Sequence, residues 1–391
     1  MLDLKRLYLD LSMSSVFRGI LKKPLFGYFE QYNKEGASLA EKINAYGSLV
    51  GEIYKNGSSL TDLVFKYVFQ DENVFVKARA KGLSPDKNIV AATVRELFVF
   101  ESFASLTPED FAKDLGVGYL SPFESEHRDL PREYEAVIAD IDKHGYGIFA
   151  ESPMFRLEDN GELLPIVSAD KTTVEGFVGY LEERQRVIDN TLAFIDNKPA
   201  ANVLLCGDAG TGKSSTVKAV VNKFFDKGIR LIELRKNQLA SLPYVMGRIS
   251  DNPLKFIIFI DDLSFNQNDD NFSMLKAALE GSASAKAENA VIYATSNRRH
   301  IIKESFGDRE GDDVHRNDTM QEILSLSERF GLVVLFQKPG KALYLEIVHN
   351  LAKRYGVTMD ENEMDIKAEA FALRRGSRSP RCAEQFIKSL V

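Results

Sequence analysis

One stretch, residues 203–218, constrains the fold and the chemistry of this chain more than any other. It reads Val-Leu-Leu-Cys-Gly-Asp-Ala-Gly-Thr-Gly-Lys-Ser-Ser-Thr-Val-Lys. Its first residues are an apolar run with the length of a buried strand, and apolar residues at helical spacing follow from Val217 onward. The residues that match the pattern G-x-x-x-x-G-K-[ST] between them are Gly207, Gly212, Lys213 and Ser214. Strand, glycine-rich turn and helix in this order predict a loop that surrounds a chain of phosphates.

The predicted loop has the properties that a bound triphosphate requires. Glycines allow the backbone to wrap around phosphates, and the backbone N–H groups and the helix N-terminus supply positive potential. Lys213 is expected to reach the β- and γ-phosphates of ATP, and the Ser214 hydroxyl to coordinate Mg²⁺. The residues expected to contact the nucleotide are Gly207, Asp208, Ala209, Gly210, Thr211, Gly212, Lys213, Ser214 and Ser215. The alternative is a glycine-rich turn that binds nothing.

Two further strand ends carry polar side chains suited to this chemistry. One apolar run ends in Asp261 and Asp262, and an acid at this place in proteins with such a loop holds Mg²⁺. We therefore expect Asp261 to bind the metal and Asp262 to polarise an attacking water. A later run leads to Asn297, which is expected to position that water, with Ser296 as the second choice. Ordinary turn chemistry is the alternative at both strand ends.

The composition is that of an ordinary globular protein with two or three domains. The chain has 391 residues, of which 44% are apolar and 27% charged. No apolar run is long enough to span a bilayer, and the N-terminus lacks the pattern of a secretory signal. Cys206 and Cys382 are too few for a disulfide framework. We therefore expect a cytoplasmic protein without membrane contact.

The charge distribution argues against a long nucleic-acid groove in the middle of the chain, and the histidine spacing argues against a histidine metal site. The net charge is −7, and residues 101–200 hold 21 Asp and Glu against 9 Lys and Arg. An acidic middle argues against a long nucleic-acid groove there, because phosphates are bound by Lys and Arg. A solvated acidic surface is the simpler interpretation. His127 and His144 have no partners at the spacing of metal ligands.

The hydrophobic patterns divide the chain into four parts. Residues 1–150 are predicted to be mainly helical and to form an interaction domain. Residues 151–171 are expected to be a linker, in which 154–166 could form a small hairpin. In residues 172–338 β-like runs alternate with helical stretches, which predicts an α/β domain with a parallel sheet covered on both faces. Residues 339–391 hold helix patterns and no clear strand. The β-like runs are residues 203–205, 229–234, 256–260, 290–294 and 332–336.

Five stretches of the second half of the chain occur together in one known superfamily. They are Gly207-Asp-Ala-Gly-Thr-Gly-Lys-Ser-Ser-Thr, Ile260-Asp-Asp-Leu-Ser-Phe, Leu279-Glu-Gly, Tyr293-Ala-Thr-Ser-Asn-Arg-Arg-His and Leu326-Ser-Glu-Arg-Phe-Gly-Leu. Residues from about 172 to 391 thereby resemble an AAA+ ATPase module, and within that superfamily a bacterial branch known only as ATP-binding proteins. The resemblance implies an α/β P-loop fold with a small C-terminal helical lid. It also implies that the loop is Walker A, that Asp261 and Asp262 are Walker B, and that Asn297 is sensor 1.

The same resemblance gives roles to two arginines. Arg329 matches the arginine finger, which acts on the γ-phosphate bound by a neighbouring subunit; a surface salt bridge is its alternative. Arg381 matches sensor 2, which reaches from the lid to the nucleotide; an ordinary charged residue in a first helical turn is its alternative. A finger acting in trans implies a ring or another homo-oligomer. The segment 179–183 resembles the one that borders adenine in this superfamily.

Two other segments have two interpretations each. Apolar residues at helical spacing, namely Leu239, Leu242, Val245, Met246 and Ile249, predict a packed helix. A pore loop of the substrate-threading type at 244–247 is the alternative. The segment 307–318 is rich in charges and is predicted to be a surface loop; the alternative is an intersubunit element that helps to place Arg329.

These features predict Mg²⁺-dependent ATP hydrolysis that is coupled to the remodelling of an unknown macromolecular partner. Two alternatives of other classes stay open. One is an ATP-dependent switch or loader that acts on nucleic acid. The other is a P-loop kinase that acts as a monomer on a small molecule.

Overall fold

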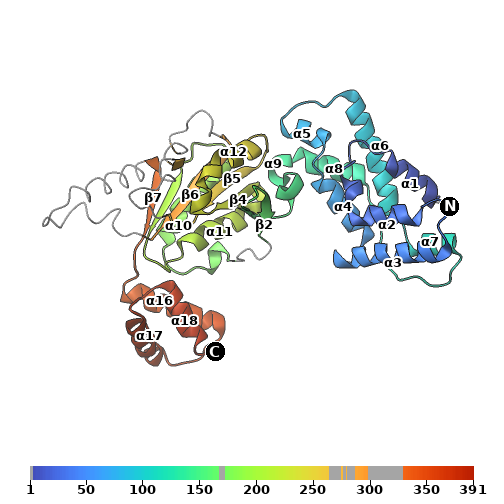
Figure 1. The fold of residues 1–391 in the computed structure, drawn as a ribbon. Helices are drawn as coiled ribbons and strands as arrows, with labels where there is room; N and C mark the ends of the chain where they lie inside the picture. The colour runs from blue at the N-terminus through green and yellow to red at the C-terminus, as the bar shows by residue number, and fades with distance from the viewer. Residues whose placement is uncertain (1–2, 167–171, 264–273, 276–278, 280–286, 298–328) are drawn as a thin grey trace. The chain divides into compact units, whose positions relative to one another are not determined.

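The computed structural model describes residues 3–166, 172–263, 274–275, 279, 287–297 and 329–391. The chain forms two compact units, Met1–Glu151 and Ser152–Val391, and Figure 1 shows their helices and strands. The first unit has one hydrophobic core of its own. The second has a core at its sheet and another in its C-terminal helices. The charged segment 307–318 lies outside the described residues.

The first unit is built from helices, which confirms the mainly helical N-terminal region. They are α1 (Leu4–Ser12), α2 (Pro24–Tyr32), α3 (Leu39–Lys55), α4 (Leu60–Gln70), α5 (Val74–Ala80), α6 (Lys87–Ala104), α7 (Pro108–Leu115), α8 (Leu130–Ala139) and α9 (Ile141–His144). Local signals begin several of them. Ser38 and Glu41 form a reciprocal capping box before α3, and α7 begins with Pro108 after the N-cap Thr107. The core is aromatic, with Phe17, Phe29, Phe100, Phe103 and Phe111 all at most 1% exposed.

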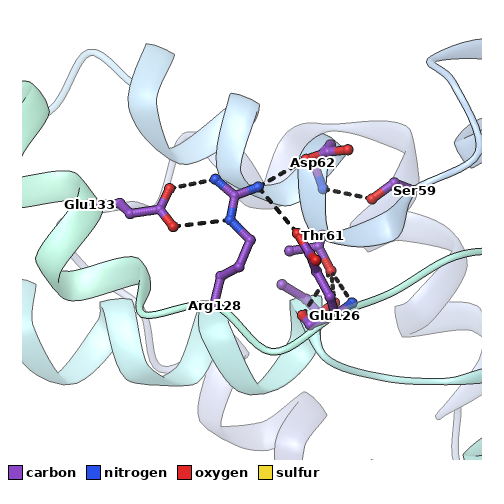
Figure 2. A network of polar contacts seen from close by, with 7 residues as sticks. Ser59, Thr61, Asp62, Glu126, Arg128 and Glu133 are labelled. Carbon is purple, nitrogen blue, oxygen red and sulfur yellow. Dashed lines mark hydrogen bonds and ion pairs between the residues drawn. The ribbon is translucent and has the colours of Figure 1, made fainter.

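Arg128 attaches the connection between α7 and α8 to helix α4 (Figure 2). Its Nε and Nη2 donate to the two carboxylate oxygens of Glu133, and its Nη1 donates to Asp62 Oδ1 at 3.0 Å. Its guanidinium also lies 4.4 Å from the centroid of the Phe65 ring. A bidentate arginine–carboxylate pair combines charge with fixed geometry. This network therefore holds an irregular segment of the first unit against a regular helix.

The second unit is organised around a seven-stranded sheet in the order β2-β1-β4-β5-β6-β3-β7. Its strands are β1 (Met154–Leu157), β2 (Leu163–Pro165), β3 (Val203–Gly207), β4 (Ile229–Leu234), β5 (Lys255–Ile260), β6 (Ala290–Ser296) and β7 (Leu332–Phe336). All neighbours pair in parallel except β1 and β2. The five β-like runs of the sequence are the five strands from β3 to β7. The strand that leads into the glycine-rich loop, β3, lies between β6 and β7.

The segment 151–171, which the sequence assigns to a linker, contributes two strands to this sheet. Residues 154–166 form the hairpin that the pattern allowed, and β1 pairs in parallel with β4, Phe155 opposite Ile232. Phe155 is fully buried. An unpaired edge strand leaves a row of backbone N–H and C=O groups without hydrogen-bond partners. Strand β1 of the hairpin supplies these partners for β4. The composition of this segment does not predict the pairing, because Ile232 lies 232 − 155 = 77 positions after its partner Phe155.

Helices cover both faces of the sheet. Helices α10 (Leu181–Ile195) and α11 (Lys213–Phe224) share one core with strand residues such as Leu205 and Ile257. Residues 256–260 of β5 are all fully buried, so both faces of this strand are covered. The apolar stripe of residues 239–249 forms a 3-10 turn (Lys236–Ser241) and the helix α12 (Leu242–Ile249). Its apolar residues are buried, which confirms a packed helix over a pore loop.

The C-terminal residues form three helices: α16 (Lys341–Tyr355), α17 (Glu361–Arg375) and α18 (Pro380–Lys388). They pack around Tyr344, Ile347 and Phe386. The predicted architecture is thereby confirmed: an α/β domain with a glycine-rich loop after β3, a small C-terminal helical lid and a mainly helical N-terminal region. In the part of the chain that the structure describes, no helix is long and apolar enough to cross a membrane.

Candidate nucleotide site

The glycines of the phosphate loop (residues 207–215) are required by its backbone. Gly207, Gly210 and Gly212 have φ angles of 137°, 77° and 91°, which L side chains rarely adopt. A Cβ on Gly207 would lie 2.0 Å from the carbonyl oxygen of Phe336 on β7. The Asp208 N–H donates to that same oxygen at 3.2 Å. The loop is therefore built against the end of β7 as well as on its own strand.

Lys213 begins helix α11 and lies with its ammonium inside the loop. Its Nζ donates to the carbonyl oxygens of Gly207 at 2.9 Å and Asp208 at 2.8 Å. A third bond, also of 2.9 Å, goes to Asn297 Oδ1 at the end of β6. The side chain is 5% exposed, and burial lowers its pKa. One cation thus connects the loop with a neighbouring strand end.

Asp261 collects hydrogen-bond donors from three elements. Its Oδ1 accepts from Ser214 Oγ at 2.6 Å and from Thr295 Oγ1 at 2.6 Å. It also accepts from the backbone N–H of Asp262 at 3.1 Å, and that N–H lies 2.9 Å from Thr295 Oγ1. Strands β5 and β6 are neighbours in the sheet, so their carboxyl ends bring these side chains together. Thr295 is not among the residues predicted from the sequence, although it lies two residues before Asn297.

Asp262 has a backbone conformation that is unusual for its residue type. Its φ is +53°, in the left-handed region that Asp and Asn tolerate better than other non-glycine residues. Its Oδ1 accepts from Asn297 Nδ2 at 2.7 Å. Asn297 therefore bridges Lys213 and Asp262 with its two amide atoms. Left-handed residues held by their surroundings are concentrated at functional sites.

A cavity of about 370 Å³ continues from the phosphate loop to the lid. Its wall contains loop residues 210–212 and Ser215, the segment 176–178 and Arg184. The lid contributes Ile347, Leu351, Arg354, Tyr355, Pro380, Arg381 and Glu384. Arg381 also donates its backbone N–H to the Gly210 carbonyl oxygen at 3.3 Å. The structure thus places Arg381 on the same cavity as the loop.

Other expected residues lie elsewhere. The segment 179–183, expected near adenine, lines a second, open hollow together with Lys338 and Leu343. The preceding residues Phe177 and Val178 line the cavity instead. Arg329 directly follows the undescribed residues 298–328 and is not among the residues that line the cavity. Its expected partner is a phosphate in another subunit, which a single chain does not contain.

Arg184 is a second residue of this region that is not among those predicted from the sequence. It lies on α10, is 4% exposed and lines the cavity. A signal was present: positions 184, 187, 188 and 191 share the buried face of α10, and an arginine is exceptional on such a face.

The comparisons with known proteins give one family and leave the activity open. A family model described as "Protein of unknown function (DUF815)" matches residues 150–391. The comparison with curated proteins finds no match. Among solved structures, the RuvB Holliday junction branch migration motor of Thermotoga maritima is similar, with 14% identity and a TM-score of 0.37. Two single-residue variants of that protein have 16% and 15% identity at the same TM-score. Each match covers 55% of this chain and spans 63% of the RuvB chain.

Proposed function

Because the chain belongs to the DUF815 family, whose description names no activity, we propose its function from the site: it binds ATP with Mg²⁺ and hydrolyses it to ADP and phosphate. One observation carries the proposal. Hydrogen bonds of 2.6 to 2.9 Å join Lys213 to Asn297, Asn297 to Asp262, and Ser214 to Asp261 around one phosphate loop. Binding, metal and water-activating groups are thus assembled in one place.

The phosphate loop and the cavity together suit a nucleotide. The loop offers backbone N–H groups and the N-terminus of the twelve-residue helix α11 to the phosphates. Bound phosphate oxygens would replace the two loop carbonyls that now accept from Lys213. The cavity of about 370 Å³ has the size of small-ligand sites. It mixes apolar walls, such as Val178 and Leu351, with polar groups that would fix the base and the sugar.

Ser214 and Asp261 suit a magnesium ion. A hydroxyl and a carboxylate oxygen 2.6 Å apart are hard oxygen ligands of the kind that Mg²⁺ uses together with substrate phosphates. When bound there, Mg²⁺ would neutralise negative charge on the phosphates.

Asp262 and Asn297 suit the attack by water. A water between Asp262 and the γ-phosphate would transfer a proton to the Asp262 carboxylate. The water oxygen forms the new bond to the γ-phosphorus, and the bond from that phosphorus to the β–γ bridging oxygen breaks. Asn297, whose amide now contacts both Lys213 and Asp262, would orient the water. Many relatives in the superfamily carry Glu at this place, so Asp262 is a shorter base.

We assign roles to Arg329 and Arg381 from the resemblance of their sequence stretches to AAA+ ATPases. Arg329 would stabilise the charge that develops on the γ-phosphate of a neighbouring subunit, which requires a homo-oligomer. Arg381, at the cavity, would respond to the bound nucleotide through the lid. Changes of the lid with the state of the nucleotide would act on a macromolecular partner that the site does not identify.

Two substitutions test this function. Lys213→Ala is expected to weaken MgATP binding by at least about tenfold, because a charge-assisted contact to phosphate is lost. Asp262→Asn is expected to leave binding intact, since Asn also tolerates the left-handed backbone, and to lower phosphate release by about 10²- to 10⁴-fold. Calorimetric titration and a phosphate-release assay measure the two effects.

Lys223→Ala is the matched control for Lys213→Ala. It removes an equal charge from the solvent side of α11, where Lys223 pairs with Glu175, and is expected to change neither quantity. Unchanged nucleotide affinity in Lys213→Ala would contradict the proposal.

A further inference from the structure

The strongest unexplained feature of the second unit is the buried guanidinium of Arg184. The side chain is 4% exposed and shares its helix face with Val187 and Ile188. A charged group is almost never fully buried unless an opposite charge or a ligand compensates it. Its surroundings should therefore show what compensates it.

The protein partners of Arg184 are all neutral. Nη1 donates to the carbonyl oxygens of Gly179 and, at 3.4 Å, Val178. Nε donates to Thr216 Oγ1 at 3.4 Å. The guanidinium also lies 4.2 Å from the centroid of the Phe177 ring. Among the described residues no carboxylate forms a salt bridge with it. Burial lowers its pKa to about 10, so it still carries its charge at pH 7.

The remaining nitrogen, Nη2, faces the phosphate loop. It lies 3.5 Å from the position that a Cβ on Gly212 would occupy. In the described part of the chain it has no hydrogen-bond acceptor, whereas Nε and Nη1 have theirs. Arg184 and Gly212 both line the cavity. Two N–H groups of a buried cation are thus available beside a loop that is built to bind phosphates.

We propose that Arg184 binds the α-phosphate of the nucleotide. This inference rests on the proposed function. Lys213, Asp261, Asp262 and Asn297 form one hydrogen-bonded network at the end of the loop where the γ-phosphate would lie. The hydrogen bonds of Arg184 to described residues go elsewhere, to Val178, Gly179 and Thr216. Arg184 lies instead between the loop and the cavity wall at Phe177. A group in this place faces the phosphate that is joined to the sugar.

The assignment has a kinetic consequence. Hydrolysis changes the charge on the γ- and β-phosphates and leaves the α-phosphate unaltered. A contact to the α-phosphate therefore contributes equally to the bound substrate and to the transition state. Its loss raises KM and leaves kcat nearly unchanged. This separates Arg184 from Asp262, whose loss lowers kcat.

The test is a titration of the full chain with ATP, ADP and AMP. Because all three ligands carry the α-phosphate, Arg184→Gln is expected to raise each Kd by a similar factor of about 10 to 100, the range for losing a charged hydrogen bond. Arg186→Gln is the matched control, since it removes an arginine from the exposed side of the same helix and should change no Kd. In hydrolysis assays Arg184→Gln should raise KM by the same factor and alter kcat less than twofold.

Other outcomes overturn the inference. Unchanged affinities, or a loss of affinity for ATP without a loss for AMP, would show that Arg184 does not contact the α-phosphate. Arg184→Met is measured in parallel, because it fills the same space without charge; if only one variant folds, that variant decides. If neither folds, Arg184 has a structural role and the inference is wrong. A wild-type chain that binds none of the three ligands would instead refute the proposed function itself.

Discussion

At the scale of single residues, Thr295 is the group that joins the two aspartates of the site. Its hydroxyl donates to Asp261 Oδ1 at 2.6 Å and accepts from the Asp262 N–H at 2.9 Å. It is 2% exposed, so water does not readily replace it. Thr295 would touch neither substrate nor metal, and we expect it to act as a positioning residue.

Thr295→Val should therefore impair the proposed magnesium site without unfolding the chain. Valine has nearly the same shape but leaves Asp261 and the Asp262 N–H without this partner. Supporting contacts of metal ligands are commonly worth 10- to 100-fold in metal affinity or activity. We expect the Mg²⁺ concentration for half-maximal phosphate release to rise by about tenfold or more. Thr295→Ser keeps the hydroxyl and should restore most of the wild-type value; an equal loss in both variants would point to packing instead.

At the scale of elements, the first turn of α18 contacts the phosphate loop directly. The Arg381 N–H donates to the Gly210 carbonyl oxygen at 3.3 Å. A Cβ on Gly210 would lie 3.2 Å from both Ser379 Oγ and Arg381 Cβ, which is tighter than nine in ten real Cβ contacts. The φ of Gly210 is also positive, at 77°. Gly210 is thus the loop residue against which the first turn of the lid helix α18 packs.

Gly210→Ala should consequently disturb both elements. The added methyl group must move the lid or strain the loop, and left-handed backbone costs an alanine about 1–2 kcal/mol. We expect MgATP affinity to fall by about tenfold, which corresponds to 1.4 kcal/mol. Gly247→Ala is the control: it lies in α12, with nothing within 4 Å of the new Cβ, and should be neutral or slightly stabilising. Wild-type affinity in Gly210→Ala would show that the lid does not depend on this contact.

A second prediction at the scale of elements concerns the contacts of Arg128 in the first unit. Arg128→Ala removes the contacts to Glu133 and Asp62 that Figure 2 shows, and the contact to the Phe65 ring. The side chain is 30% exposed, so we expect the free energy of unfolding of the first unit to fall by about 1–2 kcal/mol. Amide hydrogen exchange of the full chain should become faster in peptides that cover residues 116–130. Arg132→Ala, an exposed arginine on α8, should leave these peptides unchanged, and equal exchange in both variants would contradict the prediction.

The sequence predicts those parts of the site whose signal is local. Residues 207–215 follow a fixed pattern, and Asp261 and Asn297 each end an apolar run, so their strand-end positions could be predicted. The contacts of Arg184 and Thr295 could not, because they depend on which strands and segments become neighbours. The hairpin at 154–166 was visible, but its pairing with β4 was not. Short-range patterns specify elements; the order of strands in the sheet decides which side chains meet.

At the scale of the whole molecule, the proposed chemistry requires more than one chain. The loop, the two aspartates, Asn297 and Arg381 all belong to one unit, Ser152–Val391. Arg329, if it acts as the finger, would serve the site of a neighbour. Specific activity should then rise with protein concentration, as subunits associate. A monomeric kinase, the alternative from another class, would give a specific activity that is independent of concentration.

Mixing two inactive variants gives the sharper test of this arrangement. Arg329→Ala has an intact nucleotide site without a finger to donate, and Lys213→Ala has a finger without a working site. Each alone should lose about 10³-fold or more in phosphate release. In a random equimolar mixture about one quarter of sites combine an intact Lys213 with a neighbour's Arg329, and activity should return to about that fraction of wild type. A mixture of Lys213→Ala with Asp262→Asn should stay inactive, because both variants are damaged in the same half of the site. If the first mixture also stays at background, the arginine acts within its own chain or takes no part, and the oligomer is unnecessary for hydrolysis.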